Sequence, residues 1–114
     1  MNRIDLTEYG RKIYLHKDNP GELNEINLEL AGYFAYYSSQ LIPLKLAEAT
    51  FWGKFKDIEA VKPKSDAYVR ALWRITKDGN RMMEIEETLK VLDKLMSTLR
   101  TSINLAIKEL MSQK

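Results

Sequence analysis

The C-terminal third of the chain carries an apolar residue every three or four positions without interruption. Neither Pro nor Gly occurs between Arg81 and Met111, so we expect one long helix there. The alternating steps of three and four form a heptad pattern, typical of a helix that packs lengthwise against another helix. This stripe must be covered by another helix, either of the same chain or of a second copy. The residues of the pattern are Met82, Ile85, Leu89, Leu92, Met96, Leu99, Ile103, Ala106 and Leu110.

A second helical stretch precedes this helix, over residues 66–78. Ser65 is a good N-cap and Asp66 places a carboxylate in the first turn, where the helix dipole favours it. The heptad register continues backwards through Ile75 and Tyr68, which favours one helix over residues 65–112. The tripeptide Asp78-Gly79-Asn80 instead indicates a turn, and both alternatives stay open.

The first long helix is expected over residues 20–60. Asp18 or Asn19 can cap its N-terminus, and Pro20 suits the first helical position. Apolar residues then recur at steps of three and four as far as Ile58. Pro43 lies inside this pattern, and because proline removes a backbone donor and clashes with the preceding turn, we expect a kink or a restart there.

Composition completes the expected fold. At 114 residues, 45% hydrophobic and 30% charged, the chain suits one folded domain. Residues 1–19 form an N-terminal arm in which a short strand, an extended segment or a weak helical turn are all open. Without cysteine, a signal-peptide pattern or a long apolar run, the chain is expected to be cytoplasmic and outside the membrane. The expected fold is all-α, a helical hairpin or small bundle with a long coiled-coil-like C-terminal helix, and oligomeric.

Residues that could support catalysis are sparse. His16 is the only histidine, and with no cysteine the chain offers no zinc-type ligand spacing. Ser38 and Ser39 have no candidate base nearby, and small residues on an apolar helix more often mark a close helix contact. We therefore expect no enzymatic activity, no metal and no cofactor.

Basic and aromatic residues gather in the middle of the chain. Residues 45–81 hold nine basic and five acidic side chains, a net charge of +4. Lysine and arginine in such a segment could neutralise phosphates, and exposed aromatic rings could stack on bases. The opposite interpretation is a solvated helix end whose aromatic residues belong to the core, and it applies above all to Tyr33, Phe34, Phe51 and Phe55. The candidate nucleic-acid-binding residues are Lys54, Lys56, Lys62, Lys64, Arg70, Arg74 and Trp52.

The order of these segments resembles the phage UvsY-type recombination mediators. The likeness covers nearly the whole chain: "KIYLHKD", then "GYFAYYSSQL", then the basic and aromatic "LKLAEATFWGKFKD", then "KPKSDAYV", and finally "MMEIEETLKVLDKLMSTLRTSINLAIKEL". The resemblance implies a ring-like homo-oligomer assembled through the C-terminal helices. Such an oligomer binds single-stranded DNA and helps a recombinase to replace single-strand binding protein. By the same resemblance, Lys45, Lys54 and Lys56 match the DNA-contacting stretch.

Two functions follow from these observations. The first is a recombination mediator-like oligomer that binds single-stranded DNA and assists recombinase loading, assembled through the heptad residues. The alternative is a helical protein–protein interaction module, such as an adaptor, assembly chaperone or inhibitor, that does not bind nucleic acid.

Overall fold

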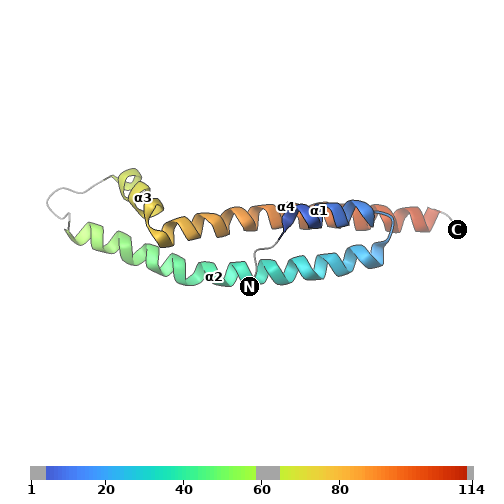
Figure 1. The fold of residues 1–114 in the computed structure, drawn as a ribbon, viewed down its shortest axis with the longest axis horizontal. Coiled ribbons are helices and arrows are strands. Elements are labelled where there is room, and N and C mark those ends of the chain that lie inside the picture. The colour runs from blue at the N-terminus through green and yellow to red at the C-terminus, as the bar shows by residue number, and fades with distance from the viewer. Residues whose placement is uncertain (1–4, 59–64, 113–114) are drawn as a thin grey trace. The chain divides into compact units, whose positions relative to one another are not determined.

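A computed structural model of the chain describes residues 5–58 and 65–112, without the side chains of residues 55–58. These residues form four helices and no strand: α1 (Leu6–Leu15), α2 (Pro20–Ile58), α3 (Asp66–Ile75) and α4 (Lys77–Ser112) (Figure 1). The expected all-α fold with a long C-terminal helix is confirmed. Over the described ranges, none of the four helices has an apolar stretch long enough to cross a bilayer.

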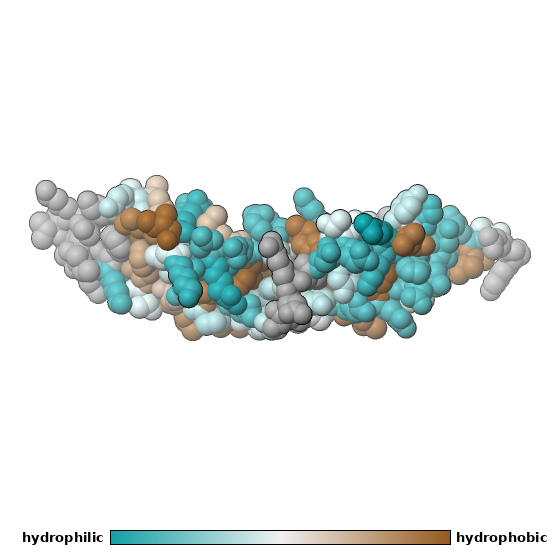
Figure 2. Space-filling view, in the orientation of Figure 1, coloured by the Kyte–Doolittle hydropathy of each residue, from teal (hydrophilic) through white to brown (hydrophobic). Residues whose placement is uncertain are grey.

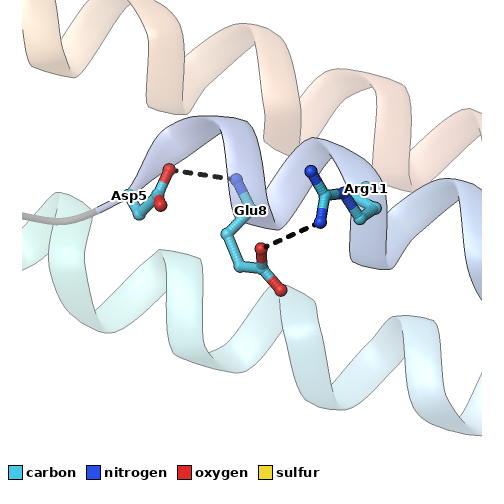
Figure 3. Close-up of polar contacts among 3 residues, drawn as sticks. All are labelled: Asp5, Glu8 and Arg11. Atoms are coloured by element: carbon cyan, nitrogen blue, oxygen red, sulfur yellow. Dashed lines mark hydrogen bonds and ion pairs between the residues drawn. The ribbon is translucent and has the colours of Figure 1, made fainter.

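Helix α1 lies where an arm without a clear structure was expected. The carboxylate of Asp5 accepts a hydrogen bond from the backbone N–H of Glu8 at 3.1 Å, which caps the helix (Figure 3). One turn later, Arg11 lies 3.8 Å from the Glu8 carboxylate. An acidic cap followed three residues later by glutamate is a known signature of a helix start, and it is the signal that predicts this helix.

Helix α2 begins as expected and is longer than its proline suggests. The side chain of Asn19 accepts a hydrogen bond from the Glu22 N–H at 3.2 Å, so Asn19 is the N-cap and Pro20 is the first helical residue. The helix continues through Pro43 to Ile58, so the expected restart does not occur. Pro43 is exposed, whereas the next residue, Leu44, is buried.

The C-terminal helical region is not one continuous helix. It is broken at Thr76, two residues before the turn that Asp78-Gly79-Asn80 indicates. Ser65 caps α3 by accepting from the Tyr68 N–H at 3.2 Å, as predicted. At the other end, the Thr76 hydroxyl donates to the Trp73 carbonyl at 2.6 Å and accepts from the Gly79 N–H at 2.9 Å. One side chain therefore closes α3 and starts α4, and residues 78–80 are already helical.

The chain divides into two compact units. The terminal unit comprises Met1–Tyr36 with Leu89–Lys114, and the central unit comprises Tyr37–Thr88. The central unit is one continuous segment, whereas the terminal unit is made of two, and helices α2 and α4 each contribute to both units. The expectation of a single domain stays a prediction.

The core of the terminal unit is formed by apolar residues of α1, α2 and α4. A polar contact adds to it: the Tyr9 hydroxyl donates to the Glu29 carboxylate at 2.8 Å, and its ring meets Tyr33 edge-on with centroids 6.1 Å apart. Burial, together with the bond to Glu29, raises the pKa of the Tyr9 phenol above its usual range. The buried residues of this unit are Ile13, Leu23, Ile26, Leu30, Leu92, Leu99 and Ala106.

The core of the central unit joins the second half of α2 to α3 and the start of α4. The ring of Phe51 packs against Trp73, with centroids 5.5 Å apart and a tilt of 54°. On the other side of the unit, the Arg81 guanidinium donates to the Gln40 side chain at 3.2 Å. The buried apolar residues here are Leu44, Val69, Trp73, Met82 and Ile85.

The backward extension of the heptad register fails at α3. Val69 and Trp73 are the buried residues of this helix, whereas Tyr68 and Ile75, the register positions, are exposed, Ile75 to 79%. The break at Thr76 changes the direction of the chain, so the face of α3 is set independently of the face of α4.

Candidate nucleic-acid interface

The predicted nucleic-acid-binding residues fall on the central unit, at the end of α2 and along α3. Four of the seven, Trp52, Lys54, Arg70 and Arg74, have described side chains. Lys56 lies in α2 but its side chain is not described, and Lys62 and Lys64 lie outside the described residues. The candidate interface is therefore built from the four described residues and their neighbours.

The Phe51–Trp73 contact brings the last described turn of α2 against α3. Trp73 is only 5% exposed and Val69, one turn before it, is buried as well. Trp73 therefore cannot offer a flat face for stacking bases, because its ring lies in the core of the unit. Its role is to hold α3 in place beside α2.

Two arginines of α3, Arg70 and Arg74, come directly after the buried Val69 and Trp73 and are exposed to solvent. Arg70 and Arg74 are spaced by four residues, so their side chains emerge from neighbouring turns of one helix face. Both are exposed, and neither forms an ion pair with any carboxylate that the structure describes. Arg74 also stands in the last turn of α3, where the helix dipole favours a cation.

Two lysines extend this charge beyond α3. Lys77, the first residue of α4, and Lys54, near the end of α2, are exposed and have no ion-pair partner among the described side chains. Lys45 is also exposed on α2, nine residues before Lys54. The guanidinium of Arg81 instead donates a hydrogen bond to the Gln40 side chain. Cations that have no ion-pair partner among the described side chains can contribute to an attraction for anions.

The aromatic residues divide between core and surface. Trp52 is half-buried, whereas Tyr68 of α3 is 46% exposed. Phe51 is half-buried against Trp73, in agreement with its expected core role, and Tyr33 is held by Tyr9 in the terminal unit. The prediction for Phe55 concerns a side chain outside those described. Tyr68 is thus the most exposed aromatic side chain described in this unit, and Trp52 is exposed in part.

The heptad residues proposed for oligomerisation are used largely within one chain. Met82, Ile85, Leu92 and Leu99 are buried, and an assembly through them would require the chain to open. Leu89, Met96 and Ile103 are half-buried, and only Leu110 is exposed. Their role in oligomerisation stays a prediction.

Comparisons with known proteins identify no relative. No protein-family model, no curated protein and no solved structure matches the chain. Within the described residues, no three histidine, cysteine, aspartate or glutamate side chains gather in a way that could hold a metal ion. The function of the central unit therefore has to be argued from its own charges and contacts.

Proposed function

We propose that the protein binds single-stranded nucleic acid through the basic surface of its central unit and has no enzymatic activity. The observation that carries this proposal is a group of exposed cations with no ion-pair partner among the described side chains: Lys54, Arg70, Arg74 and Lys77. In a surface that serves only solubility, cations and carboxylates are usually interspersed and neutralise one another. Here Asp66 and Asp78 lie four residues before Arg70 and four after Arg74, yet no ion pair joins either arginine to a described carboxylate.

Phosphates and bases would be held by different residues. Each lysine or arginine that contacts a phosphate releases a counterion, which makes the affinity depend on salt. The partly accessible indole of Trp52 would stack on a base, a contact worth about 1–3 kcal/mol and independent of sequence. A single strand suits this arrangement because its bases are unpaired and can reach an aromatic ring.

The biological setting follows from the resemblance to UvsY-type mediators. In that setting the protein acts in the cytoplasm of a phage-infected cell as a homo-oligomer. It presents single-stranded DNA to a recombinase while single-strand binding protein is displaced. This part of the proposal is supported by the order of the segments and by the basic end of α2.

A protein–protein interaction module is the second candidate function. It is favoured by large apolar side chains on the surface of the same unit, among them Ile42, Leu46 and Ile75. Such a module would bind a partner through these side chains and would show no salt-dependent affinity for DNA.

A fluorescence anisotropy titration with a labelled oligonucleotide separates the two functions. Replacing both Arg70 and Arg74 by Gln should weaken binding at least about tenfold and lower the salt slope by roughly 1.4, because each phosphate contact to a single strand contributes about 0.7. The matched control is Lys94→Gln with Arg100→Gln, two exposed basic residues of α4 in the terminal unit. Equal losses in both double variants, or no binding by the native chain, would overturn the proposal.

A further inference from the structure

Helix α3 exposes the residues that would continue the heptad pattern of α4. Read back from Met82, alternating steps of four and three reach Asp78, Ile75, Ala71 and Tyr68. All four are exposed, Ile75 to 79% and Tyr68 to 46%. Figure 2 shows hydrophobic surface over α3, in the orientation of Figure 1. The heptad pattern therefore continues in the sequence through the corner at Thr76, where α3 meets α4, but the residues that it predicts to be buried lose their cover there.

The two apolar faces of α3 are closely matched. The buried face consists of Val69 and Trp73, and the exposed face contains Tyr68 and Ile75. Each face has one aromatic and one β-branched aliphatic side chain, so burying either one removes a similar apolar area from water. The present face gains the contact of Trp73 with Phe51, whereas the other would gain the backbone bonds of an unbroken helix. An element with two packings of similar free energy can occupy both.

Two small groups hold the corner between α3 and α4. The Thr76 hydroxyl donates to the Trp73 carbonyl and accepts from the Gly79 N–H. Among the described glycines, only Gly79 lies where an added Cβ would overlap a backbone atom, the carbonyl oxygen of Trp73. In an unbroken helix that carbonyl would instead accept from the Lys77 N–H, one turn along, and would lie clear of residue 79. Both groups thus support the corner, and a straight helix needs neither.

The second half of α2 is long enough to cover a straightened α3. Within the central unit α2 and α4 run antiparallel (Figure 1), and the hydrogen bond from Arg81 to Gln40 shows which residues lie opposite one another. Residue 66, fifteen before Arg81, would then lie opposite residue 55, fifteen after Gln40 and still within α2. The sequence has seven residues between Ile58 and Asp66, which can reach roughly 20 Å or more and so exceed the usual spacing of packed helices. Helix α4 can therefore extend back to residue 66 while α2 stays intact.

We propose that the corner at Thr76 is a conformational switch between two forms of the central unit. In the bent form, which the structure shows, α3 is a separate helix that buries Val69 and Trp73. In the straight form, residues 66–88 are one helix, and Tyr68 and Ile75 pack against the second half of α2 in place of that pair. The switch belongs to the free chain and stands whether or not the protein binds nucleic acid.

A distance measured across the corner tests the switch. The chain has no cysteine, so spin labels can be attached through Ala67→Cys and Glu86→Cys, two exposed positions on either side of Thr76. In the straight form the two backbone positions are about 29 Å apart, and in the bent form they are closer. The native chain should give mainly the shorter distance by double electron–electron resonance. Gly79→Ala should raise the ratio of long to short distances at least about tenfold, because the added methyl group overlaps the Trp73 carbonyl in the bent form alone.

The register residues of α3 provide a second, independent test. Tyr68→Gln with Ile75→Gln, added to Gly79→Ala, should reverse the shift toward the longer distance. Both side chains are exposed in the bent form, so these substitutions weaken the straight form selectively. The matched control is Leu110→Gln with Met111→Gln, two exposed apolar residues at the end of α4, which should leave the ratio of distances unchanged.

Three outcomes overturn the proposal. The first is a folded Gly79→Ala protein that keeps the native distance. Should that variant not fold, Thr76→Ala decides in its place, because it removes both hydrogen bonds of the corner and leaves a good helix former there. The second is a folded Thr76→Ala protein with the native distance. The third is a longer distance that persists after Tyr68 and Ile75 are replaced, since the straight form would then not depend on their burial.

Discussion

Thr76 and Gly79 together set the corner between α3 and α4. The Thr76 hydroxyl bonds to the last turn of α3 and to the first turn of α4, while Gly79 packs directly on the Trp73 carbonyl. A Cβ at residue 79 would overlap the carbonyl oxygen and lie 2.6 Å from its carbon. Here glycine is required by a close backbone approach, in contrast to Gly32 and Gly53 of α2, where an added Cβ would meet no atom within 4 Å.

Replacing Gly79 by Ala should therefore destabilise the protein although alanine is the better helix former. We expect a loss of about 2 kcal/mol in the free energy of unfolding, typical of an overpacked site. Urea denaturation followed by circular dichroism measures the change. Gly10→Ala is the control and should instead gain up to about 1 kcal/mol. A gain in both variants would mean that the corner is not as close as described.

Tyr9 makes the stability of the terminal unit sensitive to alkaline pH. Its phenol is neutral in the folded protein, and its native pKa lies above the ordinary value of 10.0. The stabilisation that this group contributes is full below pH 10 and is lost as the pH rises from there toward the native pKa. Tyr9→Phe should thus lose part of its stability at pH 7 and show a shallower decline above pH 10 than the native chain. Thermal midpoints across this range would reveal parallel declines if the phenol plays no part.

At the scale of the elements, α3 depends on its tertiary contacts. A helix of ten residues is marginal in water by itself, so its burial through Val69 and Trp73 has to stabilise it. The Phe51–Trp73 contact is the aromatic pair that joins it to α2. Because α3 carries Arg70 and Arg74, the same contact positions the proposed nucleic-acid surface.

A double-mutant cycle on this pair measures the dependence. Trp73→Leu and Phe51→Leu should each destabilise the protein, and the two losses should be non-additive by about 0.5–1.5 kcal/mol, as for other aromatic pairs. Trp73→Leu should also weaken binding of single-stranded DNA, because α3 is displaced. Strictly additive losses with unchanged DNA affinity would contradict this linkage.

At the scale of the whole molecule, net charge is a poor guide to function. The chain carries a net charge of only +2, with 18 basic and 16 acidic side chains. What matters is that the cations of the central unit lack ion-pair partners among the described residues.

The sequence predicts most of the element boundaries because their signals are local. The caps at Asn19 and Ser65, the first helical position of Pro20 and the uninterrupted heptad pattern each act within one or two turns of helix. The helix of α1 also had a local signal, the spacing of Asp5 and Glu8, but its short apolar pattern obscured it. Within the candidate site, the exposure of Arg70 and Arg74 could be predicted, because arginine side chains are rarely buried.

Contacts between distant segments could not be predicted in the same way. A tryptophan side chain can lie at a surface or in a core, so its residue type does not decide where Trp73 lies. Its packing against Phe51, 22 residues earlier in the sequence, places it in the core of the central unit. The break at Thr76 rather than at residues 78–80 depends on Gly79 meeting a carbonyl of the preceding helix.

The sequence by itself determined that this chain is helical, where its long helices begin, and that a heptad stripe must be covered. These properties come from caps, propensities and periodicity, which act over a few residues. The tertiary structure alone decided that the C-terminal stripe is largely covered within one chain and that Val69 and Trp73, not the register positions, form the buried face of α3. The physical reason is that a side chain is buried only where a second helix covers it. Apolar residues spaced by three and four along one helix predict which face needs covering, but they do not say which helix covers it.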